Sequence, residues 1–276
     1  MNPEYYNRIP HTKAIIYDQL GCCRLCPHAC GVNRLEGETG LCRLDWKAYC
    51  FREMLNLTEE PGLVPSHQVY FAGCNLKCGF CSVAEWNDQP MSVPVIETDD
   101  LIERIKSRQQ QGADNLNLLG GEPAVSIYGI LELLERIPPQ TRIVWNSNMY
   151  FSEPVRQALD GLVDGYLADF KCGNGGCAQK MLGVSDYAEV VQENLLWASK
   201  QAELYIRHVA MPGHIDCCGR PIMEWVAERI PTAKVSLRFD YIPPIPAGNC
   251  PGGYLQDAER QKILKIAKQM GSNVIL

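Results

Sequence analysis

The stretch that decides the fold is Phe71-Ala72-Gly73-Cys74-Asn75-Leu76-Lys77-Cys78-Gly79-Phe80-Cys81. Its three cysteines are spaced C-x3-C-x2-C on a short loop after an apolar segment. Three thiolates at this spacing can occupy three corners of a [4Fe-4S] cluster, which normally takes four cysteines. A compact triplet therefore leaves one iron open for another ligand. The alternatives are a zinc site and three thiols that are simply buried.

The triplet carries an aromatic residue, Phe80, directly before its last cysteine. In this it resembles the signature of the radical S-adenosylmethionine (SAM) enzymes, whose open iron is chelated by the amino and carboxylate groups of SAM. The resemblance implies that Cys74, Cys78 and Cys81 are the catalytic metal ligands and that SAM is a cofactor.

The composition favours a metalloprotein that acts on small molecules or on a protein segment. The 276 residues are enough for one sizeable α/β domain with an appendage, and the net charge of -6 gives no reason to expect a nucleic-acid or membrane surface. Because we find neither a run of about 18 apolar residues nor a secretory signal, we expect a cytoplasmic protein. Structural disulfides are rare in that compartment, so the 14 cysteines indicate metal or redox chemistry.

Residues 1–66 show little regular periodicity and are predicted to form a cysteine-rich, metal-binding extension. Four of their cysteines have the spacing C-x2-C-x3-C-x11-C, namely Cys23, Cys26, Cys30 and Cys42. We expect these thiols to bind an auxiliary [4Fe-4S] cluster, with zinc and unligated thiols as the alternatives. Cys22 could replace Cys23, and His28 could replace a cysteine.

Residues 67–276 are predicted to alternate strands with amphipathic helices, the pattern of parallel βαβ units. The predicted strands are 69–72, 116–119, 143–145, 165–170, 204–209 and 235–239. The predicted helices are 99–111, 126–137, 153–160, 185–200, 220–230 and 255–270. Six repeats predict an α/β fold with a partial (β/α)6 barrel, in which the carboxyl ends of all strands share one rim.

The second predicted strand is followed by Gly120-Gly121-Glu122-Pro123. Two glycines let the backbone approach a ligand closely, and Glu122 could bond the ammonium group of the ligand or the loop around it. In this position the motif resembles the Gly-Gly-Glu element of radical SAM enzymes. The resemblance implies that Gly120, Gly121 and Glu122 contribute to SAM binding.

The third predicted strand ends in Asn146, Ser147 and Asn148. Their amide and hydroxyl groups can bond ribose hydroxyls or a carboxylate, and such residues are also common in turns. Related activating enzymes carry a Thr-Asn-Gly-like element here, which implies that all three residues contact SAM.

Two further strand ends carry charged residues. Asp169 and Lys171 are two positions apart and therefore on the same face, and Arg207 lies in the next strand. These positions resemble the Asp-x-Lys and Arg-x-x-x-x-Pro-Gly elements of the pyruvate formate-lyase activating enzymes. The resemblance places Lys171 at the SAM carboxylate and Asp169 at its amino group. We interpret the nearby His208 and His214 as structural.

Five more cysteines follow the later predicted strands. If these loops share the rim, their thiols can converge on a second auxiliary cluster. The preferred ligands are Cys172, Cys177, Cys218 and Cys250, with Cys217 as a substitute. Loop cysteines can also be incidental.

Together the motifs resemble a branch of pyruvate formate-lyase activating enzymes, although here the extra cysteines precede the triplet. The resemblance implies reductive cleavage of SAM and hydrogen abstraction from a protein or peptide substrate. It also implies a flavodoxin or ferredoxin-type electron donor. The alternatives are the modification of a small metabolite and a non-catalytic iron-sulfur or zinc scaffold.

Overall fold

The computed structural model describes residues 6–271 and 273–275. The chain forms two compact units: unit 1 consists of Met1–Asn75 and Val83–Tyr166, and unit 2 of Leu76–Ser82 and Leu167–Leu276. The strands follow one another in the order β1 to β8 in an eight-stranded sheet. The predicted α/β fold built on parallel strands is therefore confirmed, and the six predicted strands correspond to β2 to β7.

Unit 1 contains the first four strands. β1 (Cys50–Asn56) pairs antiparallel with β2 (Ser66–Phe71), and β2, β3 (Asn115–Gly120) and β4 (Ile143–Ser147) are parallel. The helices α4 (Thr98–Gln110) and α5 (Ile127–Leu134) connect these parallel strands, as parallel pairing requires. Segments that follow β2, β3 and β4 therefore emerge at the same edge of the sheet.

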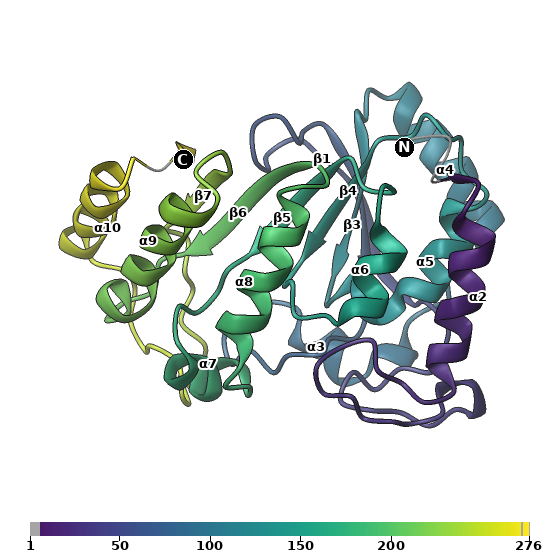
Figure 1. Cartoon of the computed structure of the whole chain (residues 1–276), viewed down its shortest axis with the longest axis horizontal. Helices are drawn as coiled ribbons and strands as arrows, with labels where there is room; N and C mark the ends of the chain where they lie inside the picture. The colour runs from purple at the N-terminus through teal and green to yellow at the C-terminus, as the bar shows by residue number, and fades with distance from the viewer. Residues whose placement is uncertain (1–5, 272, 276) are drawn as a thin grey trace. The chain divides into compact units, whose positions relative to one another are not determined.

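The helix α2 (Ile9–Leu20) belongs to unit 1 and was not predicted. It packs against α5 and α6 (Glu153–Leu159), and Figure 1 shows these three helices side by side. Ile9, Ile16 and Leu20 are buried at a spacing that places them on one face of the helix. The described residues of unit 1 also include the short helical elements η1 (Arg34–Glu36), α3 (Ala84–Asp88), η2 (Pro90–Ser92) and η3 (Pro123–Ser126).

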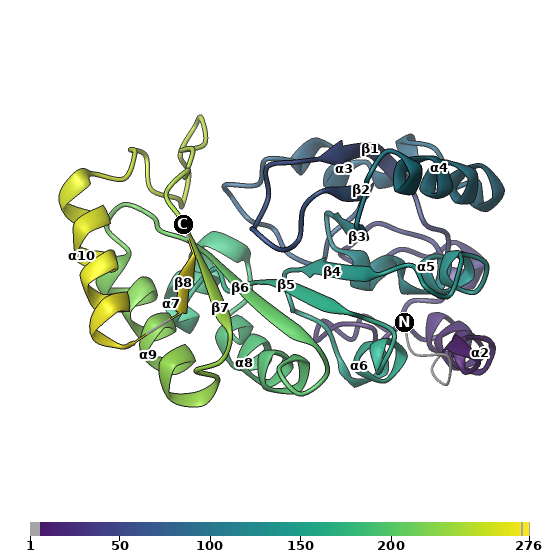
Figure 2. The same cartoon turned by 90° about the horizontal axis from the view of Figure 1, so that it is seen from above.

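Unit 2 contains the last strands. β6 (Glu203–Val209), β7 (Lys234–Arg238) and β8 (Asn273–Ile275) are parallel neighbours (Figure 2). The division between the units falls within β5 (Gly165–Asp169). The helical elements of unit 2 are α7 (Gly175–Leu182), α8 (Tyr187–Ala198), η4 (Ile215–Gly219), α9 (Arg220–Arg229) and α10 (Asp257–Gln269). In the part of the chain that the structure describes, no helix combines the length and the apolar character that a membrane span needs.

Candidate functional site

The cysteine triplet lies where the chain passes between the two units. Cys74 belongs to unit 1, whereas Cys78 and Cys81 belong to unit 2. On the unit 1 side, the loop begins at Gly73, whose φ of +86° favours glycine. A Cβ atom at this position would lie 2.6 Å from Leu44 Cδ1. The turn before Cys74 therefore needs a residue without a side chain.

On the unit 2 side, the end of α7 supports the loop. The backbone amides of Lys77 and Gly79 donate to the carbonyls of Leu182 and Met181, each at 2.9 Å. Burial raises the pKa of the Cys78 thiol to about 12, while Lys171 lowers it. A buried thiol keeps its proton unless a cation stabilises the thiolate, so Cys78 is suited to a metal.

The Gly-Gly-Glu segment packs directly against the start of the triplet loop. Gly121 donates its amide to Phe71 O at 2.7 Å, and Glu122 donates its amide to Gly73 O at 2.9 Å. A Cβ at Gly120 would lie 2.1 Å from Phe71 O, and one at Gly121 would lie 2.1 Å from Gly73 O. Both glycines are therefore required for the two strand ends to approach this closely.

The Glu122 side chain is buried and bonds the ends of the neighbouring strands. Its Oε1 accepts from Ser147 Oγ at 2.8 Å and from the Ala124 amide at 3.0 Å, and its Oε2 accepts from the Asn148 amide at 2.8 Å. Of the two roles that the sequence left open, bonding the loop is the one that these contacts favour.

Asn148 continues this network to the first cysteine. Its Nδ2 donates to Asn75 Oδ1 at 2.9 Å and lies 3.6 Å from Cys74 Sγ, within reach of a hydrogen bond to sulfur. Its Oδ1 accepts from the Tyr150 amide at 2.8 Å. Unit 1 therefore holds Cys74 and the predicted SAM residues Glu122, Ser147 and Asn148 in one hydrogen-bonded network.

Asn146 takes part in a different group on unit 1. Its Nδ2 lies 3.3 Å from Glu59 Oε1, and the other carboxylate oxygen of Glu59 accepts from Gln68 at 2.6 Å and Asn117 at 2.8 Å. The amides come from β2, β3 and β4, so three successive strands surround one carboxylate. Glu59 is not among the residues predicted from the sequence.

In unit 2, the predicted SAM residues Asp169 and Lys171 lie near Cys78 of the triplet. Lys171 Nζ is 2.5 Å from Asp169 Oδ2, and both charges act on the Cys78 thiol. The Tyr187 hydroxyl joins the backbone here, because it donates to Asp169 O at 2.9 Å and accepts from the Lys171 amide at 3.2 Å. Arg207 lies on β6, and its carbonyl accepts from the Phe170 amide at 2.9 Å.

The four predicted N-terminal ligands lie close together in unit 1. Burial raises the pKa of the Cys26 thiol to about 12, and the neighbouring Cys42, Cys23 and Cys30 raise it further. His28 Nε2 donates to Asn75 O at 2.8 Å, so this histidine links the extension to the residue that follows Cys74. Cys22 is exposed.

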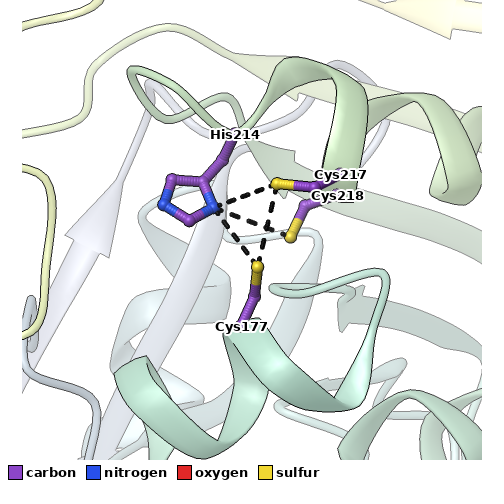
Figure 3. A group of neighbouring side chains, drawn as sticks. All are labelled: Cys177, His214, Cys217 and Cys218. Atoms are coloured by element: carbon purple, nitrogen blue, oxygen red, sulfur yellow. Dashed lines mark hydrogen bonds between the residues drawn. The ribbon is translucent and has the colours of Figure 1, made fainter.

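The later cysteines separate into two places in unit 2. Cys177, Cys217 and Cys218 converge with His214, and the four ligand atoms lie within 4.8 Å of one another (Figure 3). Cys172 is buried and hydrogen-bonded to Cys218. Cys250, by contrast, lies beside the triplet loop, because a Cβ at Gly79 would be 2.6 Å from Cys250 Sγ.

His214 belongs to this group, although the sequence predicted a structural role for it. Its spacing to the cysteine pair, His-x2-Cys-Cys, is the signal that could have identified it. Burial and the nearby Lys180 lower its pKa, which favours the neutral ring that metals bind.

Comparisons with known proteins find relatives of this chain. The relative MJ0674 of Methanocaldococcus jannaschii, named only as an uncharacterized protein, is 34% identical over 262 residues, which cover 92% of this chain and 76% of that protein. The 7-carboxy-7-deazaguanine synthase of Methanothermobacter thermautotrophicus is 26% identical over 183 residues, 61% of this chain and 74% of the enzyme.

Among solved structures, the chain is similar in fold to SuiB of Streptococcus suis bound to its precursor peptide SuiA. The TM-score is 0.53 at 14% identity, and the match covers 73% of this chain but 46% of SuiB, less than half of that protein. The family model described as "Radical SAM superfamily" matches residues 69–226, which include the triplet, the Gly-Gly-Glu segment and the Asp169–Lys171 pair. The chain therefore belongs to the radical SAM superfamily, and this membership implies a [4Fe-4S] cluster and SAM as cofactors.

Proposed function

We propose that the chain is a radical SAM enzyme that abstracts hydrogen from a protein or peptide substrate, in the manner of the activating enzymes. The SAM chemistry in this proposal is supported by the surroundings of the triplet. Each unit brings predicted SAM residues to its own part of the triplet: Asn148 and Glu122 to Cys74 in unit 1, and Lys171 and Asp169 to Cys78 in unit 2.

Cys74, Cys78 and Cys81 would hold the cluster, which with SAM and an electron from an external donor would supply reductive SAM cleavage and hydrogen abstraction from the substrate. The residues of the chain position and shield this chemistry. Lys171 offers an ammonium to the SAM carboxylate, and Asp169 can exchange its pairing with Lys171 for the SAM amino group. Glu122 acts as a positioning residue because its carboxylate is bonded to Ser147, Ala124 and Asn148.

The N-terminal thiols suit an auxiliary [4Fe-4S] cluster, which we propose for Cys23, Cys26, Cys30 and Cys42. The segment around these residues contains one short helical element, η1, and little of the apolar core. Metal binding would supply folding free energy that this segment cannot obtain from apolar burial. The hydrogen bond from His28 to Asn75 O places this segment beside the residue that follows Cys74 in the triplet loop.

A polypeptide substrate is supported by the loop between β7 and α10. Ile242, Ile245 and Tyr254 are 72%, 97% and 65% exposed, so this loop presents apolar side chains to solvent. The same loop reaches the triplet through Tyr241, whose ring is 6.2 Å from that of Phe80. An exposed apolar surface beside a catalytic loop suits a peptide chain.

A small polar metabolite is the second candidate. It is supported by the Glu59 carboxylate and the three amides around it, and by the similarity to 7-carboxy-7-deazaguanine synthase. Amides from three neighbouring parallel strands, gathered around one carboxylate, are groups that would orient a small polar ligand.

The test of the radical chemistry is 5'-deoxyadenosine formation by anaerobically reconstituted protein with a strong reductant. Cys78→Ala is expected to abolish it. Cys50→Ser is the matched control, because Cys50 lies outside all the groups described and its thiol bonds the nearby carbonyl of Arg52 at 3.1 Å, a bond that a serine hydroxyl can also donate. Undiminished turnover in Cys78→Ala would exclude this reaction at the triplet.

The substrate class can be decided by isotope transfer. A lysate from cells grown in deuterated medium is divided by dialysis into macromolecules and small molecules, and each fraction is incubated with enzyme, SAM and reductant. Deuterium in 5'-deoxyadenosine is expected with the macromolecular fraction. Deuterium only with the small-molecule fraction would favour the metabolite, and an electron paramagnetic resonance (EPR) signal of a glycyl radical would identify an activating enzyme.

A further inference from the structure

The four residues Cys177, His214, Cys217 and Cys218 form a group separate from the triplet, and they come from two segments of unit 2. Cys177 is in the first turn of α7, whereas the other three lie immediately before or within η4. Figure 3 shows the imidazole and the three thiols pointing toward a common centre. Cys177 is 37 to 41 positions away from the other three residues in the sequence. The fold therefore brings the group together, and the local sequence does not.

The distances within the group fit a single tetrahedral ion. His214 Nδ1 lies 3.5 Å from Cys177 Sγ, 3.4 Å from Cys217 Sγ and 4.0 Å from Cys218 Sγ, and the sulfurs of Cys177 and Cys217 are 3.7 Å apart. Zinc bonds of about 2.3 Å to sulfur and about 2.05 Å to nitrogen, at tetrahedral angles, give separations of about 3.8 Å between sulfurs and about 3.6 Å between sulfur and nitrogen. A [4Fe-4S] cluster, whose cysteines bind separate irons, needs its sulfurs farther apart.

We propose that Cys177, His214, Cys217 and Cys218 bind one zinc ion in a closed Cys3His site. Four protein ligands leave no open position, which is the arrangement of structural zinc sites and not of catalytic ones. The ligand set differs from the four cysteines expected from sequence: His214 and Cys217 take the places of Cys172 and Cys250.

The surroundings of the group support ligated thiolates. The Asn174 side chain accepts from the Cys177 amide at 2.8 Å, and its Nδ2 lies 3.3 Å from Cys177 Sγ and 3.6 Å from Cys218 Sγ. The same Nδ2 donates to Cys217 O at 2.6 Å. One side chain therefore orients all three cysteines, the kind of support that outer-shell residues give to metal ligands.

The site would fix the helix that supports the catalytic loop. Zinc would fasten the first turn of α7 to η4, while the last turn of α7 accepts the amides of Lys77 and Gly79 through Leu182 and Met181. Both ends of the helix would then be held, and the zinc would position the loop that carries Cys78 and Cys81. This role is structural, so the zinc content does not depend on whether the proposed hydrogen abstraction is correct.

The test is the metal content of the full-length protein purified anaerobically. We expect about one zinc per chain together with about eight irons, four for the triplet and four for the N-terminal group. The double variant Cys177→Ser/Cys217→Ser should bind about tenfold less zinc and keep its iron. Cys50→Ser should keep both metals, and His214→Cys should keep zinc because four cysteines also bind it.

X-ray absorption at the zinc edge of the unaltered protein provides a measurement that does not depend on a variant folding. Three sulfur ligands and one nitrogen ligand are expected. Four sulfurs, no zinc, or zinc retained in the double variant would each overturn the proposal. A loss of about four irons in the double variant would overturn it in favour of an iron-sulfur cluster. Cys78→Ala should retain zinc, which separates this test from that of the radical chemistry.

The positioning role has its own readout in hydrogen exchange. In the zinc-free double variant, the amides of Lys77 and Gly79 should exchange faster than in the Cys50→Ser control. Unchanged protection of these two amides, with the zinc gone, would contradict the link from the metal through α7 to the loop.

Discussion

The cysteine group near the N-terminus and the group around His214 differ in how their ligand atoms are arranged. Among the described residues, only Cys177, His214, Cys217 and Cys218 form a set of metal-binding side chains compact enough for one ion. Burial, and to a lesser extent the neighbouring Cys42, Cys23 and Cys30, raises the pKa of the Cys26 thiol, but the N-terminal thiols do not form such a set within the residues described. The difference suggests two cofactors: a cluster of several irons in unit 1 and a single ion in unit 2.

The largest expected effect concerns the N-terminal group. The variant Cys26→Ala/Cys42→Ala should lose about four irons per chain, because two ligands of the proposed [4Fe-4S] cluster are absent. Backbone amides in residues 22–42 should then exchange much faster, since the metal holds this segment folded. Iron, zinc and hydrogen exchange are measured together. A loss of zinc instead of iron would reverse the assignment of the two groups.

The next effect concerns the buried His208 and the pH dependence of stability. Burial lowers the pKa of His208 to about 4, and its Nδ1 donates to Phe170 O at 2.8 Å. Because the pKa is lower in the folded state than its ordinary value of 6.5, the stability held above pH 6.5 is lost as the pH falls toward 4. The loss attributable to this residue amounts to about 3 kcal/mol.

The measurement for His208 is the midpoint of urea unfolding between pH 7 and pH 4. His208→Asn keeps an N–H donor for Phe170 O and removes the titrating ring, so its stability should decline less on acidification. An equal decline in both proteins would assign the acid sensitivity to other groups.

A third effect concerns the hydrogen-bonded network of unit 1. Glu122→Gln places an amide NH2 against groups that are themselves donors, which we expect to cost about 1–3 kcal/mol of stability. Formation of 5'-deoxyadenosine at limiting SAM should also fall several-fold, because Asn148 is no longer held beside Cys74. Glu103→Gln, at an exposed position on α4, is the matched control. A Glu122→Gln protein as stable and active as this control would exclude the positioning role.

The smallest effect tests the link between the N-terminal extension and the catalytic loop. His28→Phe keeps the ring contact with Tyr150, whose centroid lies 5.7 Å away, and removes the hydrogen bond to Asn75 O. We expect a loss of about 1 kcal/mol in unfolding free energy with both metals retained. Loss of iron in this variant would instead indicate that His28 is a ligand of the cluster.

The sequence was most informative where function depends on short spacings. The triplet, the Gly-Gly-Glu segment and the alternation of strands and helices led directly to the family and the fold. The helix α2 was overlooked because its buried residues occur among charged and cysteine-rich surroundings, although Ile9, Ile16 and Leu20 have a helical spacing. The choice between the two roles of Glu122 could not be made from sequence, because two of its partners, Ser147 and Asn148, lie at the end of β4.

The Cys3His group shows the limit of local spacing most clearly. Five cysteines after consecutive strands predicted a convergence, but the members of the group depend on where each loop turns. Cys250 lies beside Gly79, and Cys172 is buried and hydrogen-bonded to Cys218. Neither belongs to the compact set. His214 completes the set because η4 begins directly after it and brings it beside Cys217 and Cys218.

The central claim is that the cluster on Cys74, Cys78 and Cys81 has an open iron that binds SAM. Its most direct test is electron-nuclear double resonance of the reduced protein with SAM labelled by 15N at the amino group. We predict a hyperfine coupling between the label and the cluster, and its absence in Cys78→Ala. A reduced cluster at the triplet that shows no coupling to labelled SAM would contradict the claim.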